Sequence, residues 1–242
     1  MSYGDIGRMS QRLTKALHLA EPPVAIGFSD NEDATLSRFG EPFAPASPDG
    51  RTGRVPAGCV FWMKAATQSF ATEPADHGNC SVGSLTHGLL TMDQVASNSD
   101  VAELLGSGWV SMDMVPQIPV VARRHNFVNY GPAEDCEFQP DVILIRINGR
   151  QLMVISDAVS DLSVQGKPQC HIVAMAKEQG IIAASVGCAL SRARTGMGPA
   201  EMTCAIPTPR LSDFVDEIER VSAIDNQVAK YAAADAKRFE KV

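Results

Sequence analysis

Four of the six cysteines lie in two segments of similar sequence. In the first segment, Cys59 opens a run of small and apolar residues, and Cys80 directly precedes a Ser-Val-Gly tripeptide. In the second, Cys170 opens a comparable run, and Cys188 directly follows a Ser-Val-Gly tripeptide. Core packing does not require thiols at matched positions of a repeated unit, so the pattern indicates a site built from both segments.

Thiolates are soft ligands that suit iron–sulfur clusters and zinc. We predict that Cys59, Cys80 and Cys188 bind a [4Fe–4S] cluster. Cys170 is the best candidate for a fourth metal ligand, because it occupies the repeat position of Cys59. Three cysteine ligands leave one iron open to take a sulfur or halogen atom from a substrate, whereas four close the site and favour electron transfer or a structural role.

Polar side chains near the cysteines are candidates for catalysis. His77 lies in a polar turn and is a predicted catalytic residue, as a proton donor. Arg192 follows Cys188 and is the second, because a guanidinium group suits a carboxylate or phosphate. Arg194 shares this chemistry, and Glu201 is a candidate to hold either arginine in place. The alternative for both arginines is a solvated helix face or a structural ion pair.

Three further residues are weaker candidates. His87 follows the first Ser-Val-Gly tripeptide, and His171 is adjacent to Cys170. Either histidine has the chemistry for proton transfer, but a single histidine is more often structural. Lys64 lies one helical turn after Cys59 and is a candidate to face the same cavity, although most lysines are solvated.

The two remaining cysteines lie outside the repeat. Cys136 lies between Asp135 and Glu137, whose negative charges disfavour a thiolate, and we predict an incidental surface thiol there. Cys204 directly precedes an apolar stretch and is predicted to lie in the core.

Composition narrows the class of protein. The chain has 242 residues, of which 45% are hydrophobic and 20% charged, enough for one large domain or two closely packed halves. The net charge of −7 argues against a nucleic-acid partner. The N-terminal segment lacks the apolar core of a signal peptide, and no apolar run approaches the roughly 20 residues of a membrane span. We therefore expect a cytoplasmic protein without a membrane partner, in which cysteines serve as ligands or reactive thiols rather than as disulfides.

The predicted fold class is α/β, a single globular unit (residues 1–242) made of two related α/β halves. The halves cover about residues 20–105 and 138–210, and each has an apolar strand after proline, a cysteine-led helix and a Ser-Val-Gly turn. A C-terminal helix is predicted over residues 212–240. The other predictions are helices over 6–17, 60–72, 92–105, 150–160 and 170–179, strands over 24–28, 142–147 and 181–186, an extended segment over 109–130, and a long loop over 40–58.

The C-terminal helix carries a stripe of apolar residues at helical spacing: Phe214, Ile218, Val221, Val228 and Tyr231. We expect this stripe to pack on the body of the protein. A homodimer contact is the alternative.

Several of these segments resemble the family known as domain of unknown function 169. The resemblance covers roughly residues 5–220 and implies a soluble prokaryotic-type protein whose recurrent cysteines match Cys59, Cys80 and Cys188. The family pattern favours a glycine soon after the last cysteine, where this chain has Ala-Leu-Ser, so the shape of that loop is expected to differ. The matching segments are residues 140–145, 59–88 and 185–192, Glu201-Met202 and Ile206-Pro207.

These features predict an iron–sulfur enzyme that acts on a small anionic substrate by cleaving a carbon–sulfur or carbon–halogen bond. One alternative is a non-catalytic protein that binds or senses a metal or cofactor. Another is a metal-free enzyme with a cysteine nucleophile and His77 or His171 as its base. Motifs for nucleotide phosphates, zinc proteases and serine hydrolases do not occur in the chain.

Overall fold

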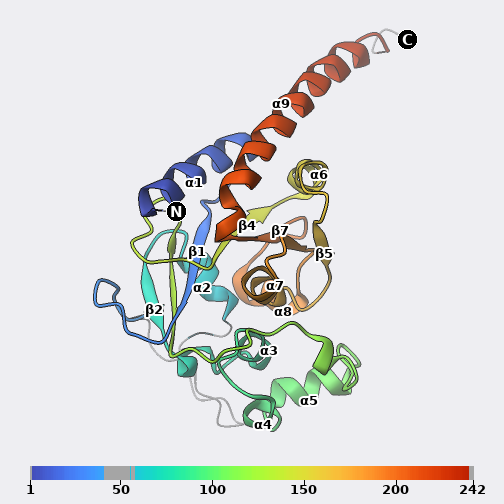
Figure 1. Cartoon of the computed structure of the whole chain (residues 1–242). Helices are drawn as coiled ribbons and strands as arrows, with labels where there is room; N and C mark the ends of the chain where they lie inside the picture. The colour runs from blue at the N-terminus through green and yellow to red at the C-terminus, as the bar shows by residue number, and fades with distance from the viewer. Residues whose placement is uncertain (1, 41–54, 56–57, 240–242) are drawn as a thin grey trace.

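A mixed sheet of seven strands runs through the centre of the protein (Figure 1). The structure is a computed structural model that describes residues 2–40, 55 and 58–239. The strands are β1 (Val24–Ser29), β2 (Phe70–Thr72), β3 (Phe127–Pro132), β4 (Val142–Ile147), β5 (Ser163–Gln165), β6 (Ala183–Ser185) and β7 (Met202–Pro207). Their order across the sheet is β2-β3-β1-β4-β7-β6-β5, with β5 and β6 parallel and the other neighbours antiparallel.

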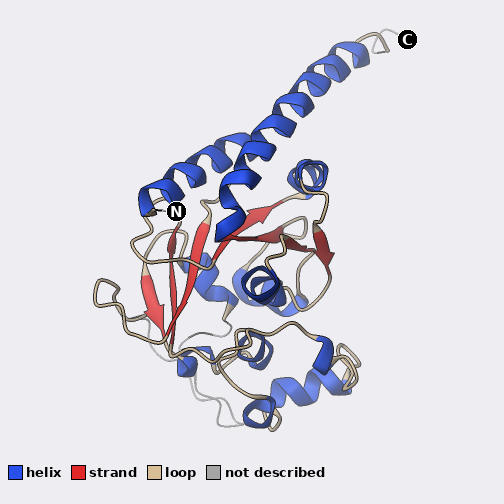
Figure 2. Ribbon diagram, in the orientation of Figure 1, coloured by secondary structure: helices blue, strands red, loops and turns tan. Residues whose placement is uncertain are grey.

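Helices cover the sheet, as Figure 2 shows. The α-helices are α1 (Tyr3–Leu17), α2 (Cys59–Lys64), α3 (Ser81–Thr86), α4 (Met92–Val95), α5 (Ser99–Gly106), α6 (Gly149–Ala158), α7 (His171–Gln179), α8 (Ala189–Thr195) and α9 (Leu211–Ala236). Short 3-10 helices are η1 (Pro74–His77), η2 (Val115–Gln117) and η3 (Thr208–Arg210). Within the described residues, no helix combines the length and apolar character needed to cross a bilayer.

Strand β4 shows how the sheet divides the core into two layers. Ile143, Ile145 and Ile147 pack with residues of α1, α6 and α9, whereas Val142 and Leu144 pack with residues of α2 and α7. Successive side chains of a strand point to opposite faces, so the part of β4 that is buried on both faces, residues 142–145, is apolar throughout. The predicted α/β class is confirmed, with helices on both faces of one sheet.

The two cysteine-containing segments fall on opposite sides of the sheet centre. Strands β1 and β4 pair antiparallel there, with Val24 opposite Leu144 and Ile26 opposite Val142. On one side, the chain order of α-helices and strands is β1, α2, β2, α3, α4, α5, β3, and on the other it is β4, α6, β5, α7, β6, α8, β7. Outward from the centre of the sheet, β1 is followed by β3 and then β2, and β4 is followed by β7 and then β6. Helices α2 and α7 thus occupy corresponding places, as do α3 and α8.

The two Ser-Val-Gly tripeptides do not share one structure. The first forms the opening residues of α3, whereas in the second Ser185 ends β6 and the next two residues lead to α8. The shared feature is the cysteine at the start of the following helix. Sequence similarity therefore matched two cysteines that lie at helix starts, but it misplaced the turn in the first half.

Several predicted elements differ from the structure. The helix expected over 60–72 ends at Lys64, and Phe70–Thr72 instead forms an edge strand beside β3. The helix expected over 92–105 is two helices with a break before Ser99. In the segment 109–130, only its last residues join the sheet, in β3. Most of the loop predicted over 40–58 lies outside the described residues.

Cys136 is buried, so the prediction of a surface thiol is wrong. Its side chain is only 4% exposed, and its Sγ donates a hydrogen bond to the carbonyl oxygen of Phe138 at 3.0 Å. Asp135 and Glu137 are exposed, because alternate residues of this extended segment point to opposite sides. Cys204 lies in the core on β7, as predicted.

Helix α9 packs on the body through its first half only. Phe214, Ile218 and Val221 are buried beside α1 and α6, whereas Val228 and Tyr231 are 59% and 69% exposed. Figure 1 shows the second half of the helix projecting away from the sheet. The expectation that the whole apolar stripe packs on the body is therefore wrong for its last two residues.

Two isoleucines on α9 provide a matched test of this division. Ile218→Ala should lower the free energy of unfolding by about 2–5 kcal/mol, because a fully buried side chain leaves a cavity. Ile224→Ala should change it by no more than about 0.5 kcal/mol, because Ile224 is 50% exposed. Urea unfolding of both variants measures the difference.

Similar losses in the two variants would contradict this division of α9. A loss for Ile224→Ala that grew with protein concentration would show that a second copy covers this residue.

Candidate functional site

Four cysteines line a single cleft, which we call the thiol cleft. Each lies at the start of a helix: Cys59 is the first residue of α2, and Cys80, Cys170 and Cys188 are the N-cap residues of α3, α7 and α8. We call these four residues the cleft cysteines. They come from corresponding places in the two halves, so the fold brings the two predicted ligand pairs to one site.

Burial raises the pKa values of three cleft cysteines, Cys59, Cys80 and Cys170. It is the main cause that raises the pKa of Cys59 to about 11 and the pKa of Cys170 well above its ordinary value. The pKa of Cys80 is also raised by burial, against a hydrogen bond from the Gly83 N–H to its Sγ at 3.4 Å. The thiols also raise one another's pKa through their negative charges, which shows that they lie within electrostatic range.

Unsatisfied polar atoms surround the same space. His87 Nε2, Gln169 Oε1 and Arg194 Nη1 are buried without a hydrogen-bond partner among the described residues, and all three residues line the thiol cleft. Tyr130 Oη is also buried without a partner, and its phenol is within electrostatic range of Cys59. Buried polar groups are nearly always paired, so this concentration indicates a place for a polar or charged guest.

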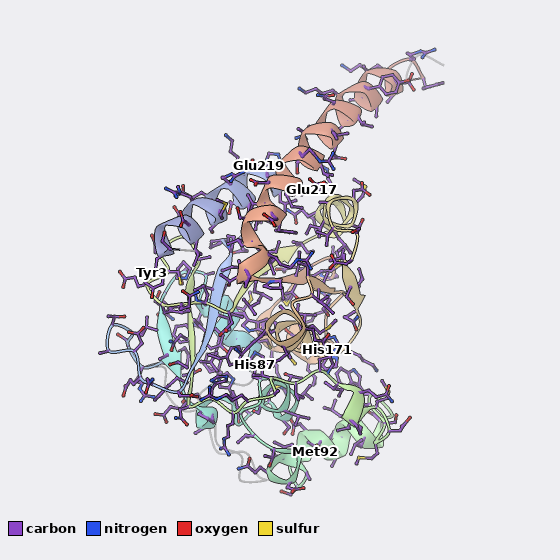
Figure 3. All side chains as sticks on the ribbon, viewed as in Figure 1. Tyr3, His87, Met92, His171, Glu217 and Glu219 are labelled. Carbon is purple, nitrogen blue, oxygen red and sulfur yellow. The ribbon has the colours of Figure 1, made fainter. Side chains whose placement is uncertain are left out.

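One ring nitrogen of His87 has no hydrogen-bond partner among the described residues. Its Nδ1 lies 2.9 Å from the Gly83 carbonyl oxygen. A carbonyl oxygen can only accept a hydrogen bond, so Nδ1 carries the proton and Nε2 has a free lone pair. Burial lowers the pKa of His87 to about 4, so the ring is neutral near pH 7. A neutral imidazole oriented through its other nitrogen is also the usual state of a histidine ligand. Figure 3 shows His87 between α3 and the sheet.

His77 also lines the cleft and is neutral. The hydroxyl of Thr72 donates to the Val128 carbonyl at 3.0 Å, so it accepts from His77 Nε2 at 2.9 Å. The Nδ1 lone pair then faces Gly58, where an added Cβ would lie only 3.1 Å away. Burial, followed by the charge of His87, lowers the pKa of His77 well below its ordinary value. This geometry favours a hydrogen-bond acceptor, and the proposed role of His77 as a proton donor stays a prediction.

The two arginines of α8 have different surroundings. Arg192 donates to the backbone carbonyls of Gly198, Val186 and Glu201, and it is not among the residues that line the cleft. A Cβ at Gly187, where φ is +114°, would lie 2.6 Å from its Nη2, so the glycine allows this close packing. The structure therefore places Arg194, rather than Arg192, beside the thiols.

Among the weaker candidates, His87 lines the cleft, whereas Lys64 and His171 do not, and Glu201 also lies outside the lining. Lys64 ends α2, and His171 begins α7, where its ring is buried (Figure 3). Glu201 pairs with Arg146 through its carboxylate, and only its backbone carbonyl accepts from Arg192. Glu201 thus holds Arg192 through its backbone carbonyl and not through its carboxylate.

Sequence reasoning missed Gln169 and Trp109, which both line the cleft. Gln169 donates through Nε2 to the Ser191 hydroxyl at 2.7 Å, a bond between α8 and the segment before α7. Its position next to Cys170 was an available signal. Trp109 lies 29 residues after Cys80 in the chain (109 − 80 = 29), and nothing in the spacing indicates that the two meet.

The residues of the site that could hold a metal or a cofactor are the four cleft cysteines. Within the described ranges, no group of three or more His, Cys, Asp or Glu side chains is arranged to hold a metal ion. The donor set nevertheless consists of four soft sulfur atoms at one cleft, with one cation beside them. Four sulfur atoms around a larger group need not meet at a single point.

Comparisons with known proteins agree with the expected family. The matched region contains all seven strands, the four cleft cysteines, His77 and Arg194. No curated protein and no solved structure matches the chain. Residues 12–217 match the domain of unknown function 169, described as Uncharacterised ArCR, COG2043, and the chain belongs to that family.

Proposed function

We propose that this protein binds an iron–sulfur cluster, with the four cleft cysteines as its ligands. One observation carries the proposal: two corresponding pairs of cysteines, distant in sequence, line the same cleft. Cysteine thiolates are the usual ligands of [2Fe–2S] and [4Fe–4S] clusters. The equal placement of Cys170 supports four ligands in place of the three that the sequence indicated most strongly.

The surrounding residues suit such a group. Burial disfavours free thiolates, so the sulfur atoms lose their protons only where metal replaces them. Arg194 Nη1 supplies an unpaired N–H beside the thiols, and its charge lowers the pKa values of Cys59 and Cys80. The Gly83 N–H already donates to the Cys80 sulfur. Hydrogen bonds and positive charge near the sulfur atoms stabilise a cluster and set its reduction potential.

A closed set of four ligands favours electron transfer or sensing. When bound, the cluster would accept and release single electrons, and the chain's residues would hold it and tune its potential. All six cysteines are free. A reducing, cytoplasmic compartment, which we expect from the sequence, would keep thiols available as cluster ligands.

A second candidate is the enzyme that the sequence predicts, acting on a small anion at an open iron. Arg194 favours it, because a buried guanidinium N–H without a partner is suited to bind an anionic substrate. In this case only three of the cleft cysteines would bind iron. The metal-free cysteine nucleophile is less favoured, because a nucleophilic thiol needs a lowered pKa and burial raises those of Cys59, Cys80 and Cys170.

Single cysteine substitutions test the ligand set. Protein purified without oxygen should be brown, with nearly equal amounts of iron and acid-labile sulfide. Alanine at any one of the four cleft cysteines should strongly reduce both amounts, because each thiolate binds one iron. Absorbance spectra with iron and sulfide analysis measure the loss.

Cys136→Ala and Cys204→Ala are matched controls, because both residues are buried cysteines outside the cleft. They should keep the cluster even if they lower stability. If Cys170→Ala alone kept the cluster, three ligands and the enzyme would be favoured. A colourless wild type without iron would exclude the cluster.

The two arginines of α8 should respond differently to substitution. Arg192→Gln should lower the free energy of unfolding by about 1–3 kcal/mol, because the carbonyls that it bonds lose their donor. Arg194→Gln should change it by about 0.5 kcal/mol or less, but should make the reduction potential of the cluster more negative, because a nearby positive charge favours the reduced form. Urea unfolding and a redox titration measure the two effects. An unchanged potential in Arg194→Gln would show that this residue does not face the cluster.

A further inference from the structure

A second cavity adjoins the thiol cleft and is lined almost entirely by apolar side chains. It lies among α3, α4, α5 and the segment that contains η2, in the lobe below the sheet (Figure 1). Figure 3 shows Met92 in this lobe. Representative lining residues are Leu85, Met92, Val101, Leu104, Val115 and Ile118.

Ser81 carries the one hydroxyl among the described residues that line this cavity, and its hydrogen bonds are made within the protein. Ser81 donates through Oγ to Asp100 Oδ1 at 2.6 Å and accepts from Asn98 Nδ2 at 2.9 Å. The Ser81 backbone N–H also donates to Asp100, at 3.0 Å. The cavity therefore offers a guest mainly apolar contact, which suits a hydrocarbon group and disfavours a polar one.

Two residues line both the apolar cavity and the thiol cleft: Val82 and Trp109. On the cleft side, Arg194 Nη1 has no partner among the described residues. Lys167 lies over the Trp109 ring, with its Nζ 4.7 Å from the ring centroid. The apolar cavity and the positively charged end of the thiol cleft thus share Val82 and Trp109 as a common wall. This positive charge is local, because the chain as a whole has a net charge of −7.

We propose that the apolar cavity and the thiol cleft bind one amphiphilic small molecule. Its hydrocarbon end occupies the apolar cavity, and its anionic end, a carboxylate or a similar group, reaches Arg194. The placement of the anionic end rests on the proposed function, because it specifies the class of molecule that approaches the cleft cysteines. The hydrocarbon end depends only on the cavity and does not require a cluster.

Calorimetric titration with three probes of equal chain length tests the proposal: octanoate, octanol and octylamine. Octanoate should bind most tightly and octylamine least, because Arg194 and Lys167 attract an anion and repel a cation. Val115→Phe fills the cavity from a half-buried position. Each methylene that it excludes should weaken binding about fourfold, so octanoate and octanol should both bind roughly fifteenfold more weakly if two are excluded.

Val120→Phe is the matched control, because Val120 lies on the same segment but is 39% exposed and outside the cavity lining. It should leave all affinities unchanged. Arg194→Gln should weaken octanoate binding toward the level of octanol and leave octanol binding unchanged.

Absence of binding by octanoate and octanol, or equal affinities in Val115→Phe and the wild type, would overturn the proposal. Octanoate binding that Arg194→Gln does not affect would overturn the placement of the anionic end. Iron analysis of the same samples tests the cluster separately, because the probes require only the folded chain. Probe binding to iron-free protein would thus reject the cluster and keep the amphiphile site.

Discussion

The antiparallel pairing of β1 with β4 is the contact on which the rest of the structure depends. It joins the two halves at the centre of one sheet, with Ala25 opposite Ile143. Because the strands outside this pair follow corresponding orders, helices α2 and α7 lie on the same face, and so do the cysteines at their starts. Each half supplies two thiols, and neither half alone would form the cleft. Both faces of the central strands are buried, which fixes their register against a shift of one residue.

Burial gives the thiol cleft its chemical character. Burial raises the pKa values of Cys59, Cys80 and Cys170 and keeps His77 and His87 neutral, which avoids the cost of buried charge. Among the described residues that line the cleft, the one cation is Arg194, which is only half-buried. The backbone orients the imidazole of His87 through Gly83, and the hydroxyl of Thr72 orients His77. These contacts fix the orientation of lone pairs and N–H groups around the thiol cleft before a ligand binds, which lowers the free-energy cost of reorganisation on binding.

The two elements farthest from the sheet centre differ in how they relate to this cleft. The second half of α9 leaves the body with exposed apolar residues and has no contact with the site. The lobe of α4 and α5 instead attaches to the body beside α3, the helix that Cys80 begins. Apolar residues of this lobe therefore lie next to the thiol cleft. The apolar residues of α9 do not: those in its first half stabilise the fold, and those in its second half are exposed to any partner.

The sequence by itself determined the α/β class, the central strands, the apolar stripe that buries the first half of α9 and the matched positions of two cysteine pairs. These features depend on local periodicity and on matched residue types, which one chain displays directly. The short strand at Phe70–Thr72 and the burial of Cys136 could not be predicted, because pairing partners and the face of an extended segment are set by distant residues. Only the tertiary structure decided that Arg194 rather than Arg192 lines the cleft. Two arginines only two residues apart on one short helix look alike in sequence, but they point in different directions, and their roles depend on which carbonyls and thiols the fold brings beside them.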